Sequence, residues 1–260
     1  ATYATYIRCH DDIGWAITDE DAAAVGVTGY GHRSFLSDFY EGTFPGSFSK
    51  GALFGVNEDT GDKRMSGSFA SLAGLERALE DGDAAAVDRA VSRILMGHAL
   101  IASYGGIPLI YMGDEAALLN DWSYLEEPDK AHDSRWVHRP AMDWDRIARL
   151  SAGDDGSSEA RVWHGLRGIM ERRKATPELH AGHATHVPGV PVKGVFALVH
   201  DAPTGALLCL FNFTEGTVAV PGEWAVSEGV SHFHDALADQ PVRMTDGNIE
   251  IAPYGALWIR

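Results

Sequence analysis

One short segment of this sequence places two carboxylates and a histidine side by side. Residues 8–15 read Arg-Cys-His-Asp-Asp-Ile-Gly-Trp, so His10, Asp11 and Asp12 are adjacent. Such a group can bind a metal ion, act as an acid or a base, or hold sugar hydroxyls while stabilising a positive charge that develops on the sugar. The alternative is a solvated turn, because His-Asp-Asp is not a rare combination. The elements around the segment bear on which reading is correct.

These elements predict a strand–helix–strand unit. Residues 3–9, with Tyr, Thr and Ile, predict a strand that ends where the polar cluster begins. Asp83 is suited to cap a helix that runs to Tyr104 and stops at two glycines. The apolar run 107–112 predicts a second strand, buried on both faces as in a parallel sheet. Polar clusters at the carboxyl ends of parallel strands are where (β/α)8 barrels hold their active sites.

The rest of the chain predicts a packed excursion, a second helix and an all-β end. Residues 13–81 are too rich in aromatic side chains for a disordered linker and indicate an insertion that forms part of a binding site. A polar loop at 114–156 precedes a helix over 157–176, which Pro177 ends. Short segments after Pro177 predict an antiparallel β-sandwich. These segments are 193–200, 206–213, 217–220, 231–234, 241–245 and 249–259.

The composition excludes several classes of partner. The 260 residues include 37 acidic and 21 basic side chains, for a net charge of −16. Nucleic acids and anionic membranes require a basic surface, so this chain suits a neutral ligand such as a sugar. Cys9 and Cys209 cannot form a disulfide framework, and no Cys/His spacing indicates zinc. A reducing, cytoplasmic location is favoured over secretion.

Three local features carry no functional weight. The apolar stretch 94–113 is about as long as a membrane-spanning helix, but His98, two glycines and Pro108 interrupt it. The N-terminal residues have neither the basic region nor the apolar run of a signal peptide. The sequon Asn212-Phe213-Thr214 is of a kind that occurs often by chance.

Motifs spread over nearly the whole chain resemble one family. Residues 7–15 and 133–140 (Asp-Ser-Arg-Trp-Val-His-Arg-Pro) are two of these characteristic segments. The others are 19–23, 46–48, 60–62, 66–67, 106–115, 118–121, 165–167, 177–179 and 253–258. Together they resemble the C-terminal portion of amylosucrases, enzymes of the α-amylase clan in glycoside hydrolase family 13. The strand-7 motif at 7–15 is typical of the clan, whereas the long insertion and residues 134–140 are typical of the family.

The resemblance implies a fold and the limits of its parts. The fold class would be α/β plus all-β: the last two strand–helix units of a (β/α)8 barrel, followed by an antiparallel β-sandwich. Strand 7 would occupy 1–12 and an insertion lining the acceptor site 13–81. Helix 7, strand 8, loop 8 and helix 8 would occupy 82–178, and the C-terminal sandwich 179–260. Two units cannot close a barrel that needs eight, so we expect the others upstream.

The resemblance also implies roles around the reacting glucosyl unit. Asp11 would be the third catalytic carboxylate, which is not the nucleophile but grips sugar hydroxyls and favours the oxocarbenium-like transition state. His10 would donate to a hydroxyl of the same unit. Asp12 and Gly14 would face the +1 subsite, where fructosyl or the acceptor sits.

Four further residues match substrate-binding positions of the family. Arg33, Phe35 and Arg64 would line acceptor subsites, where guanidinium groups donate to hydroxyls and aromatic faces stack on sugar rings. The alternatives are surface arginines and a core phenylalanine. Arg135 would close the glucose pocket by pairing with an upstream aspartate. Without that partner we expect Arg135 to be an unpaired cation.

The implied parent reaction transfers glucose from sucrose to an α-1,4-glucan and releases fructose, with no metal or nucleotide cofactor. The nucleophile and the acid/base of this clan lie about 5–5.5 Å apart, at the ends of barrel strands upstream of strand 7. Asp114, Glu115 and Asp235 lack the family's surrounding motifs. We therefore expect this chain alone to be inactive. Ala1 is not a start methionine, which favours a fragment over a complete protein.

Two alternatives remain open: a sucrose hydrolase of the same subfamily, and a non-catalytic glucan-binding module. The expected partners are sucrose, the α-glucan acceptor and the N-terminal part of the same enzyme. Self-association is also expected, because strands 3–9 and 107–112 would expose their edges.

Overall fold

The computed structural model describes residues 2–153 and 155–260. These residues divide into two compact units. One comprises the N-terminal residues through Ile7, Val91–Ile110 and Arg161–Arg260, and the other comprises the described residues of Arg8–Ala90 and Tyr111–Ala160.

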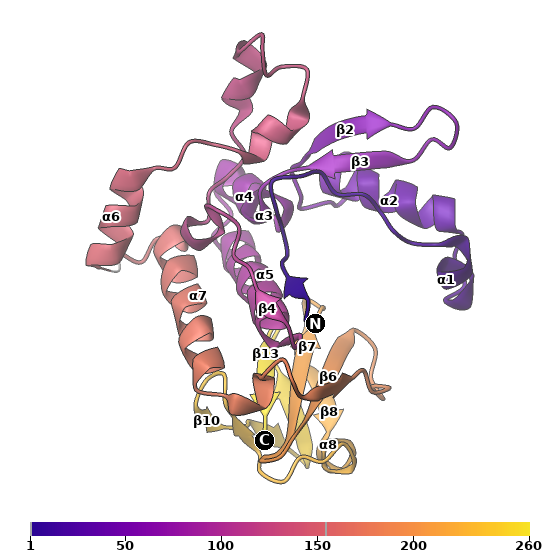
Figure 1. Ribbon diagram of the computed structural model, residues 1–260, viewed down its shortest axis with the longest axis vertical. Helices are drawn as coiled ribbons and strands as arrows, with labels where there is room; N and C mark the ends of the chain where they lie inside the picture. The colour runs from indigo at the N-terminus through magenta and orange to yellow at the C-terminus, as the bar shows by residue number, and fades with distance from the viewer. Residues whose placement is uncertain (1, 154) are drawn as a thin grey trace. The chain divides into compact units, whose positions relative to one another are not determined.

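A short parallel strand pair begins the first unit (Figure 1). β1 (Ala4–Thr5) pairs with β4 (Ile107–Pro108), and the amide of Ile107 donates to the carbonyl of Tyr3 at 2.8 Å. Helix α5 (Ala84–Ser103) lies between them in the chain, as predicted. Asp83 caps it by accepting from the amide of Ala86 at 3.0 Å.

Both strands are shorter than predicted, and the second is not buried. Ile107, Leu109 and Met112 are 60%, 45% and 46% exposed. In the described part of the chain, β1 and β4 pair only with each other. A parallel strand is buried on both faces only where further strands and helices cover it, so the predicted burial of 107–112 is wrong for this chain.

The C-terminal region of the first unit contains two antiparallel sheets. The strand order is β10-β9-β13-β7-β6-β5 in the larger sheet and β11-β12-β8 in the smaller. A short helix, α8 (Gly222–Ser227), and β5 were not predicted. The strands are β5 (Ala184–His186), β6 (Val195–Ala202), β7 (Gly205–Asn212), β8 (Val218–Pro221), β9 (His234–Asp235), β10 (Gln240–Pro241), β11 (Met244–Thr245), β12 (Asn248–Ile251) and β13 (Ala256–Ile259).

Both faces of the larger sheet are covered, which explains why the central residues of β6 and β7 are apolar on both faces. Successive strand residues point to opposite faces. Leu207, Cys209 and Phe211 therefore join a cluster with residues of α5 and α7 (Ser158–Lys174). Leu208 and Leu210 join a second cluster, which includes residues of the smaller sheet. A strand that is covered on both faces in an antiparallel sheet therefore has the same continuous apolar sequence as a strand in a parallel sheet.

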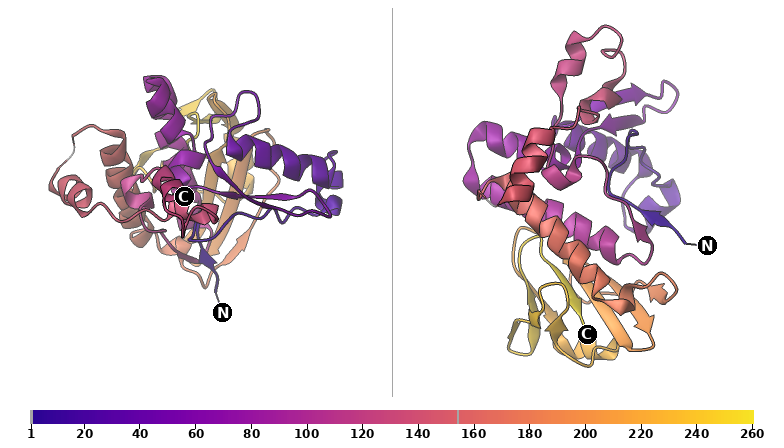
Figure 2. Two further views of the ribbon diagram at one scale, coloured as in Figure 1. Left: turned by 90° about the horizontal axis from the view of Figure 1, so that it is seen from above. Right: turned by 60° about the vertical axis from the view of Figure 1, so that its left-hand side comes forward.

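Helices α5 and α7 pack closely within this unit (Figure 2). A Cβ on Gly165 would lie 2.6 Å from a methyl group of Leu95, so a larger residue would require the Leu95 side chain to move. Arg173 donates to the carbonyls of Ala102 and Gly106. Helix α7 precedes the one-turn helix η4 (Pro177–Leu179). In the described residues, no helix has both the length and the apolar character needed to cross a membrane.

The sequon asparagine is structural. Asn212 is fully buried. Its side-chain amide donates to the carbonyls of Gly216, Ile251 and Ala252, and its side-chain oxygen accepts from Thr214. The folded chain therefore offers no accessible acceptor nitrogen at this sequon.

The second unit holds most of the predicted insertion and loop, and both are more regular than expected. A hairpin of β2 (Ala52–Val56) and β3 (Lys63–Ser66) lies beside α2 (Figure 1). The helices are α1 (Asp19–Ala24), α2 (Gly29–Glu41), α3 (Phe69–Leu72), α4 (Leu75–Asp81), η1 (Asp114–Ala116), η2 (Trp122–Glu126), η3 (Ser134–His138) and α6 (Trp144–Ala152).

Side-chain caps explain this regularity. Thr18, Thr28 and Ser68 accept from backbone amides at the starts of α1, α2 and α3. Asp121 and Asp133 do the same for η2 and η3. The polar residues that suggested irregular loops therefore mark helix starts. Tyr124 and Val137 bury η2 and η3 against Ala52 of β2.

Candidate functional site

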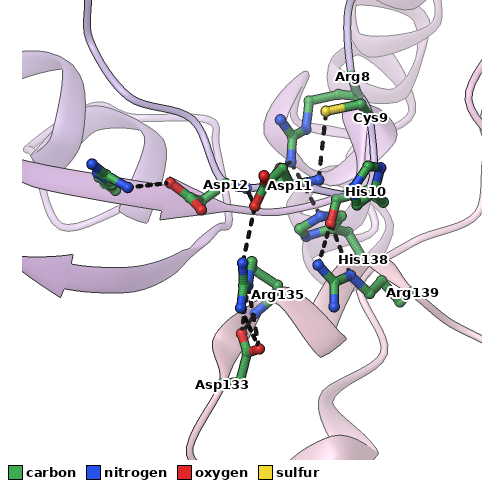
Figure 3. Close-up of polar contacts among 10 residues, drawn as sticks. Arg8, Cys9, His10, Asp11, Asp12, Asp133, Arg135, His138 and Arg139 are labelled. Carbon is green, nitrogen blue, oxygen red and sulfur yellow. Dashed lines mark hydrogen bonds and ion pairs between the residues drawn. The ribbon is translucent and has the colours of Figure 1, made fainter.

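The segment that carries the adjacent carboxylates lies along β3 in the second unit. Ile13 forms an antiparallel bridge with Met65, with N–O distances of 2.7 and 3.1 Å. This bridge fixes the segment on one side. Helix η3 approaches it from a part of the chain more than 120 residues away (Figure 3).

Asp11 is held as a carboxylate by a guanidinium group. Arg135 Nη1 donates to Asp11 Oδ1 at 3.1 Å, and the amide of Asp12 donates to the same oxygen at 3.1 Å. These contacts, the Arg135 hydrogen bond first, lower the pKa of Asp11 to about 2. The Asp11 side chain remains 51% exposed, so it is ionised and accessible.

Arg135 has two carboxylate partners in this chain. Its Nε and Nη2 donate to the two oxygens of Asp133 at 2.9 and 2.8 Å, a bidentate geometry. Its guanidinium also lies 4.7 Å from the centre of the Phe54 ring. Hydrogen bonds to Asp133 and then to Asp11 raise the pKa of Arg135. The expectation that Arg135 would be an unpaired cation is therefore wrong, because η3 brings its own aspartate.

A buried layer lies behind Asp11. Arg8 is only 4% exposed and donates to the carbonyls of Gly67 and Asp11 at 2.9 and 2.8 Å. Burial lowers the pKa of Arg8. Its Nη2 lies 3.4 Å from Nε2 of His138, which is 1% exposed. Burial, followed by the Arg8 charge, lowers the pKa of His138 to about 3, so this imidazole is neutral near pH 7.

His10 contributes its backbone to the same arrangement. Arg139 donates from Nε and Nη2 to the carbonyl oxygen of His10 at 2.8 and 2.5 Å. The residue itself is exposed, which leaves the imidazole accessible to a ligand. Figure 3 shows Arg8, Arg135 and Arg139 converging on the His10–Asp11 backbone and carboxylate.

An open groove of about 880 Å³ adjoins this segment. Three of the predicted substrate-binding residues, Gly14, Arg33 and Arg64, line it. Arg64 is 62% exposed, and its Nη1 contacts Asp12 Oδ2 at 3.4 Å. The walls are formed by Gly14–Thr18, Arg33, Phe54–Asn57 and Asp62–Arg64.

Two of the predicted acceptor-site residues have strong intramolecular contacts. Arg33 donates to Asp62 at 2.7 Å and to the carbonyl of Ile17 at 2.8 Å, which leaves few donors for a ligand. Phe35 does not line the groove. It packs edge-on against Phe44 with ring centres 4.9 Å apart and remains 37% exposed, so its place in an acceptor subsite stays a prediction.

Several residues of this arrangement were not assigned roles from sequence. Asp133, His138 and Arg139 lie inside the segment 133–140 that carried the family resemblance. The resemblance indicated that this segment matters, but the contacts of these three residues were not predicted. Phe54 gave no signal, because a strand phenylalanine is usually a core residue. In residues 2–153 and 155–260, no group of three His, Cys, Asp or Glu side chains is arranged to hold a metal ion.

The Asp11–Arg135 contact predicts a measurable titration. In the intact chain, the Asp11 side-chain carboxyl followed by carbon-13 NMR should titrate near pH 2. In Arg135→Met the midpoint should rise towards the ordinary value of 3.8, because the largest cause of the lowered pKa is removed. A pKa lowered by folding adds stability that is present above about pH 4 and is lost as pH falls towards 2. Arg146→Met, which removes an arginine that contacts Asp143 and Glu159, should leave the midpoint unchanged. An unchanged midpoint in Arg135→Met would contradict the contact.

Comparison with known families and structures gives one domain match and several distant likenesses. An AmyP variant crystallised with maltotriose is 18% identical, over 65% of this chain and 34% of its own length, with a TM-score of 0.49. A maltogenic amylase from S. marinus is 16% identical over 65% and 19%, with a TM-score of 0.43. An Anoxybacillus α-amylase is 19% identical over 75% and 35%, with a TM-score of 0.44.

This chain thus spans about a third or less of the length of these enzymes. The match to a family is local and lies at the C-terminal end. Residues 186–260, which hold most of the two antiparallel sheets, match the family model described as the C-terminal domain of amylosucrase. This part of the chain is therefore similar to an amylosucrase C-terminal domain.

Proposed function

We propose that this chain is the C-terminal part of a retaining glucosyltransferase that takes glucosyl units from sucrose, extends an α-1,4-glucan and releases fructose. The observation that carries the proposal is Asp11: an ionised, accessible carboxylate held by Arg135 next to an open groove. The similarity of residues 186–260 to the amylosucrase C-terminal domain supports it.

In this proposal Asp11 acts on the glucosyl unit. Asp11, Asp133 and Arg135 together carry two negative charges and one positive charge, so the group retains net negative charge. That negative charge stabilises the positive charge that develops at the anomeric carbon in an oxocarbenium-like transition state. The accessible carboxylate can also accept from sugar hydroxyls, and the exposed His10 can donate to one.

The groove is the proposed acceptor side. Arg64 offers an exposed guanidinium for sugar hydroxyls, with Asp12 as its anchor. Gly14 leaves room on the wall, since nothing lies within 4 Å of a Cβ built there. Trp15 and Phe54 add aromatic surface of the kind on which sugar rings stack. Arg33, bound to Asp62, shapes this wall more than it binds a ligand.

The covalent step needs a nucleophile and an acid/base about 5–5.5 Å apart. We assign both to a part of the enzyme that precedes this chain in sequence. The 260-residue chain should then release no fructose from sucrose, whereas the full-length enzyme should release fructose and form glucan. Chromatography of the products measures both. Turnover by the chain alone, or a full-length enzyme that leaves sucrose intact, would contradict the proposal.

The same experiment separates the alternatives. A sucrose hydrolase would give equal amounts of glucose and fructose and no glucan. A glucan-binding module would leave sucrose intact in every form of the protein yet retard the chain in a gel that contains α-glucan. The aromatic side chains of Trp15 and Phe54 and the exposed Arg64 in the groove are the observation that favours the second alternative.

A further inference from the structure

Both peptide groups that flank Asp11 are held by arginine side chains. The carbonyl of His10, which belongs to the peptide group before Asp11, accepts two hydrogen bonds from Arg139. The carbonyl of Asp11, which belongs to the peptide group after it, accepts one from Arg8. Because peptide groups are planar, the orientations of these two planes determine φ and ψ of Asp11.

The side chain of Asp11 is fixed separately. Arg135 and the amide of Asp12 both donate to Oδ1. The contact from Arg135 holds the carboxylate directly, whereas the amide of Asp12 belongs to the peptide group that Arg8 holds and therefore links the backbone to the carboxylate. Arg135 and Arg139 both belong to the short segment that includes η3, and His138 lies between them.

His138 holds the buried arginine in place. Arg8 donates from Nε to the carbonyl of Gly67 and from Nη2 to the carbonyl of Asp11. The imidazole of His138 faces that same Nη2 with its Nε2 at 3.4 Å. An arginine is always a donor, so Nε2 must be the acceptor and the proton of the neutral ring must lie on Nδ1. Tyr111 fixes the backbone here by donating to the carbonyl of His138 at 3.2 Å.

The Arg139 contact is supported on its other side. The guanidinium of Arg139 lies 5.6 Å from the centre of the Trp136 ring. A guanidinium that stacks on an aromatic ring and donates twice to one oxygen has little freedom to move. A lysine keeps the charge, but its donors share one nitrogen, so it cannot reproduce the two nitrogens that donate to this oxygen.

We propose that Arg139, together with His138 acting through Arg8, positions the Asp11 carboxylate for transition-state stabilisation. This inference rests on the proposed function. It adds that residues 135–139 form one positioning element, which fixes the carboxylate through Arg135 and the two adjacent peptide groups through Arg139 and Arg8. A charge that is already in place costs no reorganisation when the reaction occurs. Displacements on the order of 1 Å cost about 10²-fold in rate.

The first test uses a readout that needs no enzymatic activity. The titration of the Asp11 carboxyl is measured by NMR in the intact 260-residue chain. Arg139→Met leaves Arg135 intact but removes both the backbone contact and a nearby positive charge, and each loss should raise the midpoint; Arg139→Lys keeps the charge and isolates the effect of the contact. Arg139→Lys should give an intermediate midpoint, and Arg146→Met should give the wild-type one. An unmoved midpoint in a folded Arg139→Met chain, as judged by circular dichroism, overturns the proposal.

The second test is kinetic and uses the full-length enzyme with sucrose. Arg139→Met should lower kcat by about 10²-fold and change KM by less than about threefold, because positioning acts on the transition state. His138→Leu should also lower kcat, whereas His138→Gln, which keeps an acceptor towards Arg8, should recover most of it. Wild-type kcat in Arg139→Met overturns the proposal. An inactive wild-type enzyme overturns the proposed function instead, and the NMR result then decides the positioning role alone.

Discussion

Replacing Asp11 with asparagine in the full-length enzyme should lower kcat for sucrose by about two to three orders of magnitude. Asn keeps the size of the side chain and can still accept from Arg135, so the local backbone should be retained. Under the proposed function, what it loses is the negative charge that faces the developing positive charge on the glucosyl unit, and the charged acceptor for sugar hydroxyls. Initial rates of fructose release over a range of sucrose concentrations separate kcat from KM.

The matched control for this experiment is Asp129→Asn. Asp129 lies in an exposed part of the loop between η2 and η3, and this substitution removes the same charge from the same unit. Its kcat should equal that of the wild-type enzyme. A loss of less than about tenfold in Asp11→Asn would remove Asp11 from the transition state. Equal losses in both variants would point to net charge as the cause.

The secondary structure that was predictable from sequence is that set by local rules. Helix α5 was found because Asp83 supplies a cap and the apolar residues recur at helical spacing, and both are properties of neighbouring residues. Strands β6 and β7 were found because their apolar runs are bounded by glycine and by polar residues. Ile107 shows the limit: an apolar strand indicates burial, but burial depends on which other strands lie beside it.

The candidate site divides in the same way. The grouping of His10, Asp11 and Asp12 could be predicted from the sequence because the three residues are adjacent. The pairing of Asp11 with Arg135 joins residues 124 positions apart and depends on where η3 packs. The pairing of Arg135 with Asp133 is local, but it needs the turn geometry of a short 3-10 helix, which polar sequence alone did not indicate. Arg33 was predicted to bind a ligand, but in the structure it donates to Asp62. That contact forms only when the β2–β3 hairpin brings Asp62 close, so the sequence did not indicate it.

Trp258 tests how much the core between the larger sheet and helices α5 and α7 stabilises this part of the chain. Trp258 is fully buried and packs in the cluster that joins the larger sheet to α5 and α7. Trp258→Ala should lower the free energy of unfolding by about 3–5 kcal/mol, because it removes the indole and leaves a cavity. Urea unfolding followed by circular dichroism measures the change.

Two further variants separate packing from hydrogen bonding at this position. In the described part of the chain, the buried Nε1 of Trp258 has no hydrogen-bond partner. Trp258→Phe therefore removes an unsatisfied donor along with some apolar surface, and the first change offsets part of the second. It should cost less than half as much as Trp258→Ala. Trp144, which is 72% exposed, is the control, and Trp144→Ala should change stability by less than about 0.5 kcal/mol. If Trp258→Ala cost no more than Trp144→Ala, packing around the indole would not stabilise this sheet. If Trp258→Phe cost as much as the alanine variant, the indole N–H would have a partner that matters, because shape and apolar area alone cannot produce that equality.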